Sequence, residues 1–232
     1  KLLSEFKKSW LLWGGKPIET EVQSSKLEVK SEESELKTPN FQLSTFNFAI
    51  GLPVLSIFAS SSRGRRRLRR LLYYSINHAG KSIFLTTAYF TPSRRMIDML
   101  SEAVTRGVIV RLLLPLKSDV LAADYAGRAS FTELLRAGVQ IYNYKGRILH
   151  AKTAVFDGCW SIIGSANLDF QSLRWNDEGN VGILDKNFGQ KMIDVFEEDI
   201  KNSARIEMEE WIKRNFCEKI KERFFALFRR RL

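Results

Sequence analysis

Three residues of different chemistry stand close together between positions 150 and 157. They are His150, Lys152 and Asp157, in the spacing H-x-K-x-x-x-x-D, and the turn-forming sequence Gly164-Ser165-Ala166-Asn167 follows them. Together these groups suit chemistry at a phosphodiester, which needs a nucleophile or acid, a positive charge for the phosphate oxygens, and neutral hydrogen-bond donors. The sequence contains one other histidine, His78, which has no such neighbours. For a reaction that needs two imidazoles, this chain therefore supplies only half of the site.

The composition is that of a globular protein with a basic surface. Hydrophobic residues make up 44% of the 232 residues, and 37 Lys and Arg against 26 Asp and Glu give a formal net charge of +11. This apolar content is typical of a folded chain rather than a disordered one. The positive charge favours polyanionic partners, which include nucleic acid, anionic lipid head groups and phosphate-bearing substrates. Charge alone does not choose among them.

The sequence indicates neither a disulfide framework nor a metal site. Cys159 and Cys217 stand alone without C-x-x-C spacing, and the two histidines are far apart. We therefore expect no bound metal and no cofactor. No apolar run approaches the ~20 residues that cross a bilayer.

The first 45 residues differ from the rest of the chain. Residues 4–13 have the aromatic spacing of a short amphipathic helix, and residues 19–45 are polar and charged, as in a linker. A compact domain is expected from residue 46 to residue 232. Because the sequence starts at Lys1 without an initiator methionine or a signal peptide, we expect it to be a piece of a longer protein.

From residue 46 onward, strand patterns and helix patterns alternate. Strands are expected at residues 48–60, 82–87, 108–114, 139–142 and 180–184. Helices are expected at residues 64–78, 93–106, 119–137, 168–174, 188–199 and 204–228. This alternation predicts an α/β layered fold.

The motif residues fall on a predicted β-hairpin. Residues 148–156 alternate between two faces, which predicts a strand with His150 and Lys152 on the same face, about 6–7 Å apart. Asp157-Gly158 is a hairpin turn sequence. Residues 160–163 are expected to return as the second strand, which ends at Gly164-Ser165.

These motifs resemble those of the phospholipase D superfamily, whose signature is H-x-K-x4-D followed by G-S-x-N. Further stretches are similar to the C-terminal half of bacterial cardiolipin synthases: Ala88–Ser93, Arg106–Pro115, Leu134–Tyr142, Leu149–Lys152 and Gly164–Asp169. The resemblance runs from about residue 46 to the C-terminus. It implies a phospholipase D-like layered fold, in which helices flank a mixed β-sheet.

Members of the family that this chain resembles either carry two such motifs in one chain or dimerise a chain with one motif, so that two histidines meet. Residues 1–18 resemble the tail of a preceding half-domain, which favours the first arrangement. The resemblance therefore implies that residues 46–232 form a catalytic half-domain. Its partner would be a second half-domain of the same longer chain, or the other subunit of a homodimer.

The resemblance also implies roles for the site residues. One histidine attacks phosphorus to give a phosphohistidine and the other protonates the leaving alcohol, and His150 takes one of these roles. Lys152 neutralises phosphoryl oxygens in place of a metal ion, and Ser165 and Asn167 donate further hydrogen bonds to them.

Two carboxylates compete to orient the imidazole through its other nitrogen. Asp157 is the acid of the motif, but at a strand rise of ~3.3 Å per residue it lies well away from His150. A role at the turn fits it better. Glu178 is the stronger candidate, because the family carries an acid at that place, 28 residues after the histidine. Asn176 is expected to support the phosphate site.

The resemblance implies an enzyme that cleaves or transfers phosphodiesters of phospholipids, with an alcohol as acceptor. It also implies peripheral association with an anionic membrane surface, that of the bacterial cytoplasmic membrane, and the basic segments 63–70 and 219–232 are compatible with it. Two alternatives stay open. One is a homodimeric phosphodiesterase or nuclease, which the positive charge favours. The other is an inactive or lipid-binding fragment that lacks its partner motif.

Overall fold

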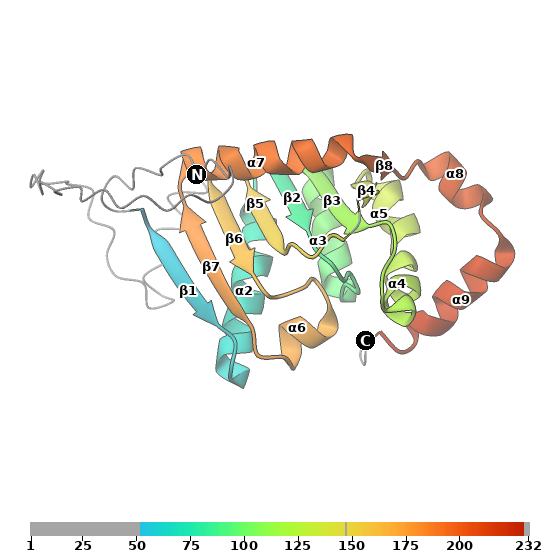
Figure 1. Ribbon diagram of the computed structural model, residues 1–232, viewed down its shortest axis with the longest axis horizontal. Coiled ribbons are helices and arrows are strands. Elements are labelled where there is room, and N and C mark those ends of the chain that lie inside the picture. Colours follow the sequence, from blue (N-terminus) through green and yellow to red (C-terminus); the bar gives the residue numbers. More distant parts are fainter. Residues whose placement is uncertain (1–51, 147, 230–232) are drawn as a thin grey trace, which may run out of the picture.

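Strands and helices alternate along the chain (Figure 1). A computed structural model describes residues 52–146 and 148–229. The strands are β1 (Val54–Phe58), β2 (Ser82–Thr86), β3 (Ile109–Pro115), β4 (Gln140–Tyr144), β5 (Thr153–Phe156), β6 (Trp160–Gly164), β7 (Gly179–Leu184) and β8 (Ser203–Arg205). The helices are α2 (Ser62–His78), α3 (Arg94–Thr105), α4 (Leu121–Arg128), α5 (Phe131–Ala137), α6 (Phe170–Arg174), α7 (Lys186–Lys201), α8 (Met208–Lys213) and α9 (Phe216–Ala226).

Within the described residues the strands form one eight-stranded sheet in the order β1-β7-β6-β5-β2-β3-β4-β8. β2, β3 and β4 run parallel to one another, and the other neighbouring pairs are antiparallel. The predicted α/β fold with a mixed sheet is therefore confirmed. These directions bring the ends of β2, β3, β4 and β6 and the starts of β5 and β7 to one edge of the sheet. We call it the lower edge, as it is oriented in Figure 1.

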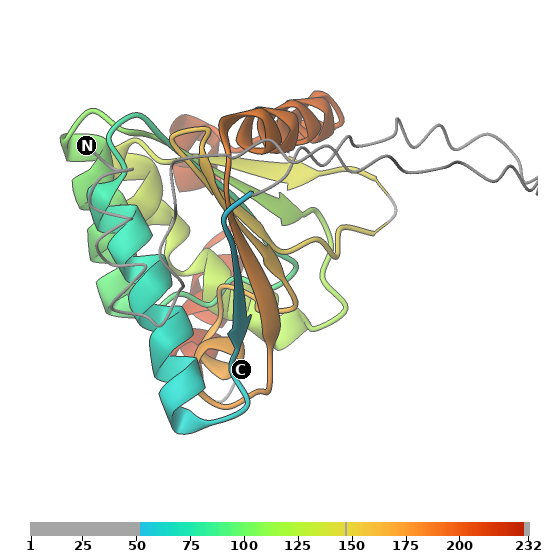
Figure 2. The ribbon, with the colours of Figure 1, turned by 90° about the vertical axis from the view of Figure 1, so that its left-hand side faces the viewer.

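Helices cover both faces of the sheet (Figure 2). On one face α2, α3 and α5 bury Leu71, Leu100 and Leu134 against the strands. On the other face α7 crosses the strands, and its Phe196 stacks on Phe84 of β2 with the ring centroids 5.1 Å apart. Burial of these apolar faces on the sheet is the main stabilising contribution of such a layered fold.

The burial of each strand follows from this layering. In β2, Ile83 and Leu85 face the α2 layer while Phe84 faces α7, so the three central residues of the strand are all apolar. The outer strand β1 alternates instead, with Leu55 and Ile57 buried and their neighbours exposed. Both patterns are visible in the sequence as runs of different periodicity.

The prediction of a single helix at residues 119–137 is wrong, because α4 and α5 are separate helices. Ser130 between them is buried, and its hydroxyl donates a hydrogen bond to the carbonyl of Gly127 at 2.7 Å. Such a bond back to the preceding turn competes with the regular helix. A Cβ on Gly127 would lie 2.0 Å from the carbonyl oxygen of Phe90, so this glycine allows α4 to approach the chain that follows β2.

The prediction of one helix at residues 204–228 is also wrong. Residues 203–205 form β8, which pairs with β4 and is the outermost strand on that side of the sheet. Without β8, β4 would have an open edge, and such an edge offers backbone partners that a helix pattern does not anticipate. α8 and α9 follow, and Asn215 caps α9 by accepting a hydrogen bond from the N–H of Cys217 at 3.0 Å.

The predictions for residues 1–45 lie outside the described residues. They comprise the helix at 4–13, the half-domain tail at 1–18 and the linker at 19–45.

Candidate functional site

The lower edge of the sheet gathers most of the predicted site residues. β5 is antiparallel to β2, so Lys152, just before β5, lies where β2 ends. The carbonyl of Lys152 accepts a hydrogen bond from the N–H of Gly164, the last residue of β6, at 3.2 Å. Gly164 pairs in turn with Asn180 of β7, and Glu178 comes directly before β7. Segments that are distant in the sequence thus meet at one edge.

The strand predicted at residues 148–156 begins only at Thr153, so the prediction that His150 and Lys152 lie in a strand is wrong. The reason is that β2 ends at Thr86, opposite Thr153, and the chain then leaves the sheet. Residues before 153 have no strand partner on that side. Instead the ammonium of Lys152 donates a hydrogen bond to the carbonyl of His150 at 2.8 Å, and His150 is exposed to solvent.

Lys152 and Asn167 line a small cavity of about 30 Å³ that residues of the sheet, α2 and α6 enclose and whose other lining residues are mostly apolar. Partial burial lowers the pKa of Lys152, while the nearby carboxylates of Glu178 and Asp169 act in the opposite direction. The ammonium is therefore partly shielded from water and within electrostatic reach of two carboxylates. Among the described residues, His150 is not part of this lining.

The turn after β6 is held by the close packing of Gly164. A Cβ at this position would lie 2.3 Å from Oδ1 of Asn180 and 2.4 Å from the carbonyl oxygen of Gly179, so a larger residue does not fit. Beyond it, the hydroxyl of Ser165 donates a hydrogen bond to the carboxylate of Glu178 and accepts one from the N–H of Gly179 at 3.0 Å. The predicted residues Ser165 and Glu178 are thus brought together.

The carboxamide of Asn167 is positioned by the chain that follows β2. Its Oδ1 accepts a hydrogen bond from the N–H of Tyr89 at 3.3 Å, and the hydroxyl of Thr87 lies 3.2 Å from the same oxygen. Because the oxygen is engaged, the Nδ2 group is left as the donor of this side chain. Sequence reasoning misses Thr87 and Tyr89, because their contact with Asn167 joins distant segments.

Asp157 lies at the opposite edge of the sheet from His150. Its carboxylate accepts hydrogen bonds of 2.8 to 3.1 Å from the N–H groups of Gly80, Lys81 and Ser82. It therefore fastens the loop between α2 and β2 to the β5–β6 turn. The structure does not bring Asp157 to the imidazole of His150. This corrects the prediction that Asp157 belongs to the catalytic residues, and it agrees with the predicted role at the turn.

Asn176 and His78 also lie away from the small cavity. Asn176 is exposed in the turn after α6, where its N–H donates to the carbonyl of Gln171 at 3.0 Å. His78 ends α2 near the start of β2, its Nδ1 lies 2.9 Å from the carbonyl oxygen of Tyr74, and its ring stacks on that tyrosine. Of the two histidines in the sequence, His150 is the one at the lower edge.

Asp169 is a further residue of this region that sequence reasoning misses. Its buried carboxylate caps α6 by accepting a hydrogen bond from the N–H of Ser172 at 2.6 Å. Burial raises the pKa of Asp169 to about 6, the hydrogen bond from Ser172 opposes this shift, and the nearby Glu178 adds to it. The sequence signal is an aspartate three residues before a serine at a helix start, which is typical of an N-cap.

The lower edge thus combines an exposed imidazole, a partly buried ammonium and a carboxamide donor. Lys152 can balance the charge of a phosphate, Asn167 can donate to its oxygens, and His150 is accessible for attack or proton transfer. In the part of the chain that the structure describes, no three His, Cys, Asp or Glu side chains gather as metal ligands would.

Comparison with known proteins places this arrangement in a family. Residues 72–200 match the family described as "Cardiolipin synthase, PLD-like domain". Cardiolipin synthase A of Cronobacter sakazakii is 38% identical over 161 residues, which cover 69% of this chain and 33% of that protein. Cardiolipin synthase A of Escherichia coli is 39% identical over 150 residues, which cover 65% and 31%. The chain therefore spans about a third of the length of these curated relatives.

Solved structures share the fold at low sequence identity. The phospholipase D family member Nuc from Salmonella typhimurium aligns with a TM-score of 0.59 and 18% identity, over 67% of this chain and 99% of that chain. Phosphatidylserine synthase from Haemophilus influenzae aligns with a TM-score of 0.65 and 15% identity, over 78% and 48%. Because the family match covers more than half of its residues, this chain belongs to the cardiolipin synthase PLD-like domain family, within the phospholipase D superfamily.

Proposed function

We propose that this domain is half of an enzyme that moves the phosphatidyl group of a phospholipid to an alcohol through a phosphohistidine. The family of the chain and the names of its relatives support this substrate class. The observation that carries the proposal is that three different functional groups lie at the lower edge. They are the imidazole of His150, the ammonium of Lys152 and the carboxamide of Asn167. These are the groups that a phosphate in transfer requires.

The proposed reaction has two displacements. First, an imidazole nitrogen attacks phosphorus, a P–N bond forms, and the P–O bond to the leaving alcohol breaks as a second imidazolium protonates its oxygen. Then the hydroxyl oxygen of the acceptor attacks phosphorus, its proton passes to the second imidazole, and the electron pair of the broken P–N bond returns to the first. Lys152 and Asn167 offset the charge of the non-bridging oxygens in both steps. Water in place of the acceptor gives hydrolysis.

The second imidazole must come from outside the described domain. The sequence holds two histidines, and His78 precedes the start of β2 at the edge opposite to His150. A side chain at that edge does not reach a phosphate at the other. We therefore propose that a second H-x-K motif completes the site, either from the same longer chain or from the other subunit of a homodimer.

The test compares His150→Asn with the matched control His78→Asn in the complete natural protein. Asparagine keeps a polar side chain and removes the nucleophile and proton carrier. With labelled phosphatidylglycerol vesicles, His150→Asn should lower phosphatidyl transfer by about 10²–10⁴-fold, the contribution of a positioned acid or base. His78→Asn should transfer at the wild-type rate. Products are separated by thin-layer chromatography, and an acid-labile labelled protein band reports the phosphohistidine.

Several outcomes would contradict the proposal. Equal activity of the two variants would remove His150 from the chemistry. Cleavage of DNA in the presence of a chelator, without any action on phospholipid, would favour the homodimeric nuclease instead. Full activity of a monomer with a single H-x-K motif would contradict the need for a second imidazole.

We also propose that α9 holds the domain on an anionic membrane surface. None of the described helices has the length and apolar character needed to cross a bilayer. One side of α9 exposes apolar side chains at helical spacing: Phe216 (72% exposed), Ile220 (50%) and Phe224 (54%), and the cap residue Leu227 (78%) continues them. Arg223 is also exposed on this helix, and Lys219 is half-buried. An apolar stripe beside basic residues is typical of interfacial helices, and α9 lies toward the lower edge (Figure 1).

Co-sedimentation with vesicles tests this surface. The double variant Ile220→Glu and Phe224→Glu should lose binding to phosphatidylglycerol vesicles, because glutamate adds negative charge to a face that enters an anionic interface. Val195→Glu, on the exposed side of α7 (57% exposed), is the matched control and should bind like wild type. Unchanged binding of the double variant, or equal loss in the control, would exclude α9 as the membrane contact.

A further inference from the structure

A basic pocket lies where α2, the start of α3 and α6 meet. Its volume is about 320 Å³, which is in the range of ligand pockets. Among the described residues, its lining contains no aspartate or glutamate, but it contains five arginines: Arg69, Arg94, Arg95, Arg174 and Arg229. It shares no lining residue with the small cavity at Lys152, so it is a separate site.

Most of this positive charge is not balanced within the protein. Arg94 forms ion pairs with Asp98 at 2.9 Å and with Glu133 at 2.5 Å. Three other arginines of the pocket have no ion-pair partner in the part of the chain that the structure describes: Arg69, Arg95 and Arg174. An anion is therefore the ligand that the charge of the pocket favours.

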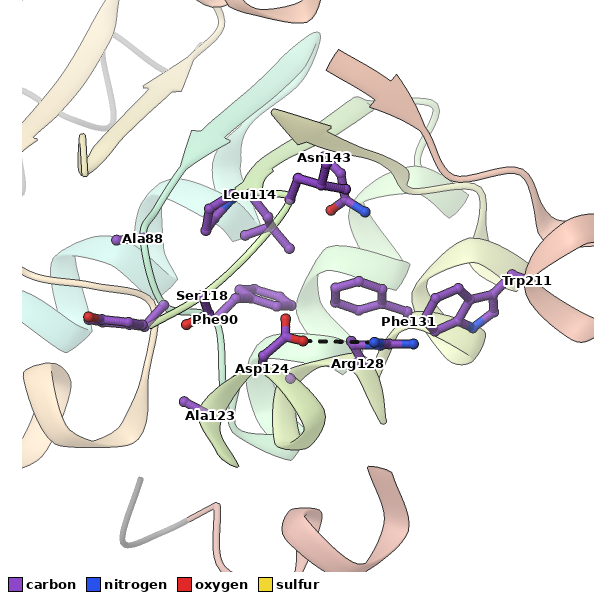
Figure 3. Close-up of a pocket in the computed structure, with 14 residues that line it drawn as sticks. Ala88, Phe90, Leu114, Ser118, Ala123, Asp124, Arg128, Phe131, Asn143 and Trp211 are labelled. Atoms are coloured by element: carbon purple, nitrogen blue, oxygen red, sulfur yellow. Dashed lines mark ion pairs between the residues drawn. The ribbon is translucent and has the colours of Figure 1, made fainter. Parts of the chain in front are cut away.

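A neighbouring cavity shows the contrast. The chain after β2 lines it through Ala88 and Phe90 (Figure 3). Its charged residues, Asp124 and Arg128, form an ion pair of 3.8 Å, which Figure 3 marks. The charges of that cavity thus offset each other, whereas those of the arginine pocket do not.

Arg69 is fixed in the wall of the pocket. Its side chain is half-buried, and its Nη1 donates a hydrogen bond to the carbonyl of Leu173 at 2.9 Å. Burial lowers the pKa of Arg69, and the nearby guanidinium of Arg174 lowers it further, as do those of Arg66 and Arg70. Guanidinium groups this close repel one another, and a bound anion relieves that repulsion.

Two aromatic rings orient further guanidinium groups. The guanidinium carbon of Arg95 lies 5.3 Å from the ring centroid of Tyr73, and that of Arg174 lies 4.8 Å from the ring centroid of Phe170. Stacking on a ring restrains the plane of a guanidinium and leaves its N–H groups free to donate. Arginines held in this way are suited to paired hydrogen bonds with phosphate oxygens.

The start of α3 adds to the attraction for an anion. Ser93 caps this helix by accepting a hydrogen bond from the N–H of Met96 at 3.3 Å, and the first turn contains Arg94 and Arg95 but no acid. The first N–H groups of a helix have no partner within the helix and carry partial positive charge. Two arginines at this end are unfavourable by themselves, and a bound anion offsets their charge.

The hydroxyl of Thr91 is an independent observation. Thr91 lines the pocket and is 2% exposed, and its Oγ1 has no hydrogen-bond partner among the described residues. Most buried hydroxyl groups have a partner. An oxygen atom of a ligand in the pocket supplies one.

We propose that this pocket binds a phosphate group, carried by an anionic lipid or by a soluble molecule, with Arg69, Arg95 and Arg174 as its ligands. Three guanidinium groups offer more N–H donors than the roughly four acceptor positions of a carboxylate can use, which favours a phosphate. The site goes beyond the proposed function, because none of these arginines takes part in the two displacements at the lower edge. Its test does not require that function.

Calorimetric titration of the purified full chain with inorganic phosphate tests the site. The wild type should bind phosphate, and the double variant Arg95→Gln and Arg174→Gln should bind it at least about tenfold more weakly, because charged hydrogen bonds are lost. Both arginines are exposed, so the fold should be retained. If circular dichroism shows that the double variant is unfolded, the single variant Arg174→Gln is compared instead, with a smaller loss in the same direction.

The matched control removes the same amount of charge elsewhere. Lys81 and Lys186 are exposed and lie outside the pocket, so Lys81→Gln with Lys186→Gln should bind phosphate like wild type. An equal loss in this control would mean that only the net charge matters and would overturn the site. Absence of phosphate binding by the wild type, or unchanged binding by the arginine variant, would overturn it as well.

Competition identifies the source of the phosphate group. Displacement of inorganic phosphate by dihexanoyl phosphatidylglycerol below its micelle concentration assigns the pocket to a lipid head group. Lack of displacement assigns it to a soluble phosphate, and both results support the site. A DNA duplex that binds the arginine variant and the control equally well, while inorganic phosphate does not bind the wild type, would replace the pocket by a nucleic-acid surface.

Discussion

The hydroxyl of Ser165 donates a hydrogen bond to the carboxylate of Glu178, and the N–H of Gly179 donates to the same hydroxyl at 3.0 Å. A serine hydroxyl has one hydrogen, so in this arrangement Ser165 cannot also donate to a phosphate. Glu178 is buried, and its carboxylate depends on this contact. If Ser165 binds phosphate and Glu178 orients His150, the hydrogen bond between Ser165 and Glu178 must break when substrate binds.

The first prediction concerns this pair. Ser165→Ala should lower the free energy of unfolding by about 1–3 kcal/mol, because a buried carboxylate loses its hydroxyl donor. Glu178→Gln is the matched variant, since it keeps the shape and an acceptor oxygen but removes the charge. The double variant should lose less free energy of unfolding than the two single variants lose in sum. The difference, which is the coupling energy of the pair, should be at least about 0.5 kcal/mol. Urea unfolding followed by circular dichroism measures all four proteins, and strictly additive losses would show that the pair does not interact.

The second prediction separates structure from catalysis at Asp157. This residue has a φ of 52°, in the left-handed region, and holds three N–H groups of the α2–β2 loop. Asp157→Ala should cost about 2 kcal/mol or more of stability, because these donors lose their acceptor and alanine is strained there. Asp157→Asn should cost less, since asparagine tolerates this conformation and keeps an oxygen. Neither change should alter the kcat of the folded fraction, and a loss of kcat in well-folded Asp157→Asn would return this acid to the catalytic set.

The third prediction concerns the space around Gly164. Gly164→Ala should destabilise the domain by about 1–3 kcal/mol, as an overpacked core position does, and should displace Ser165. The new Cβ would overlap with Asn180 and with the backbone of Gly179, at 2.3 and 2.4 Å. Gly80→Ala is the control, because the nearest atom to its Cβ is 3.8 Å away, an ordinary contact. Thermal unfolding of the two variants should differ clearly, and equal melting temperatures would argue against the tight turn.

The fourth prediction follows from the pKa of Asp169, which burial raises from 3.8 to about 6. The folded state therefore holds this proton more tightly than the unfolded state, so stability falls as the pH rises from about 4 to about 6, and the loss is complete above that range. Asp169→Asn keeps the helix cap without a charge to bury. It should be more stable than wild type above that range by on the order of 2 kcal/mol, and the difference should vanish toward about pH 4.

Urea unfolding of wild type and Asp169→Asn at several pH values checks this sign. Comparing the two proteins at each pH cancels the titration of the other groups. A difference that does not change with pH would mean that the buried carboxyl keeps its ordinary pKa.

Most helices and strands of the fold can be predicted from short stretches of sequence. The apolar run of three residues at the centre of β2 corresponds to a strand that is covered on both faces. The turn at Asp157-Gly158, where φ is 52° and 63°, joins the paired strands β5 and β6 as predicted. The failures occur where distant segments intervene. β8 pairs with β4, and β2 ends at Thr86, so residues before Thr153 have no partner on that side.

The sequence by itself determined the α/β class, the turn of the β5–β6 hairpin and the small-residue turn at Gly164, because periodicity and turn chemistry are local properties. Only the tertiary structure decided that Ser165 binds Glu178, that Asp157 holds a loop 77 residues away at Gly80, and that His78 lies at the opposite edge. Those contacts depend on the order and direction of the strands in the sheet. Neighbouring residues do not encode that order, since it is set by which faces can be buried together.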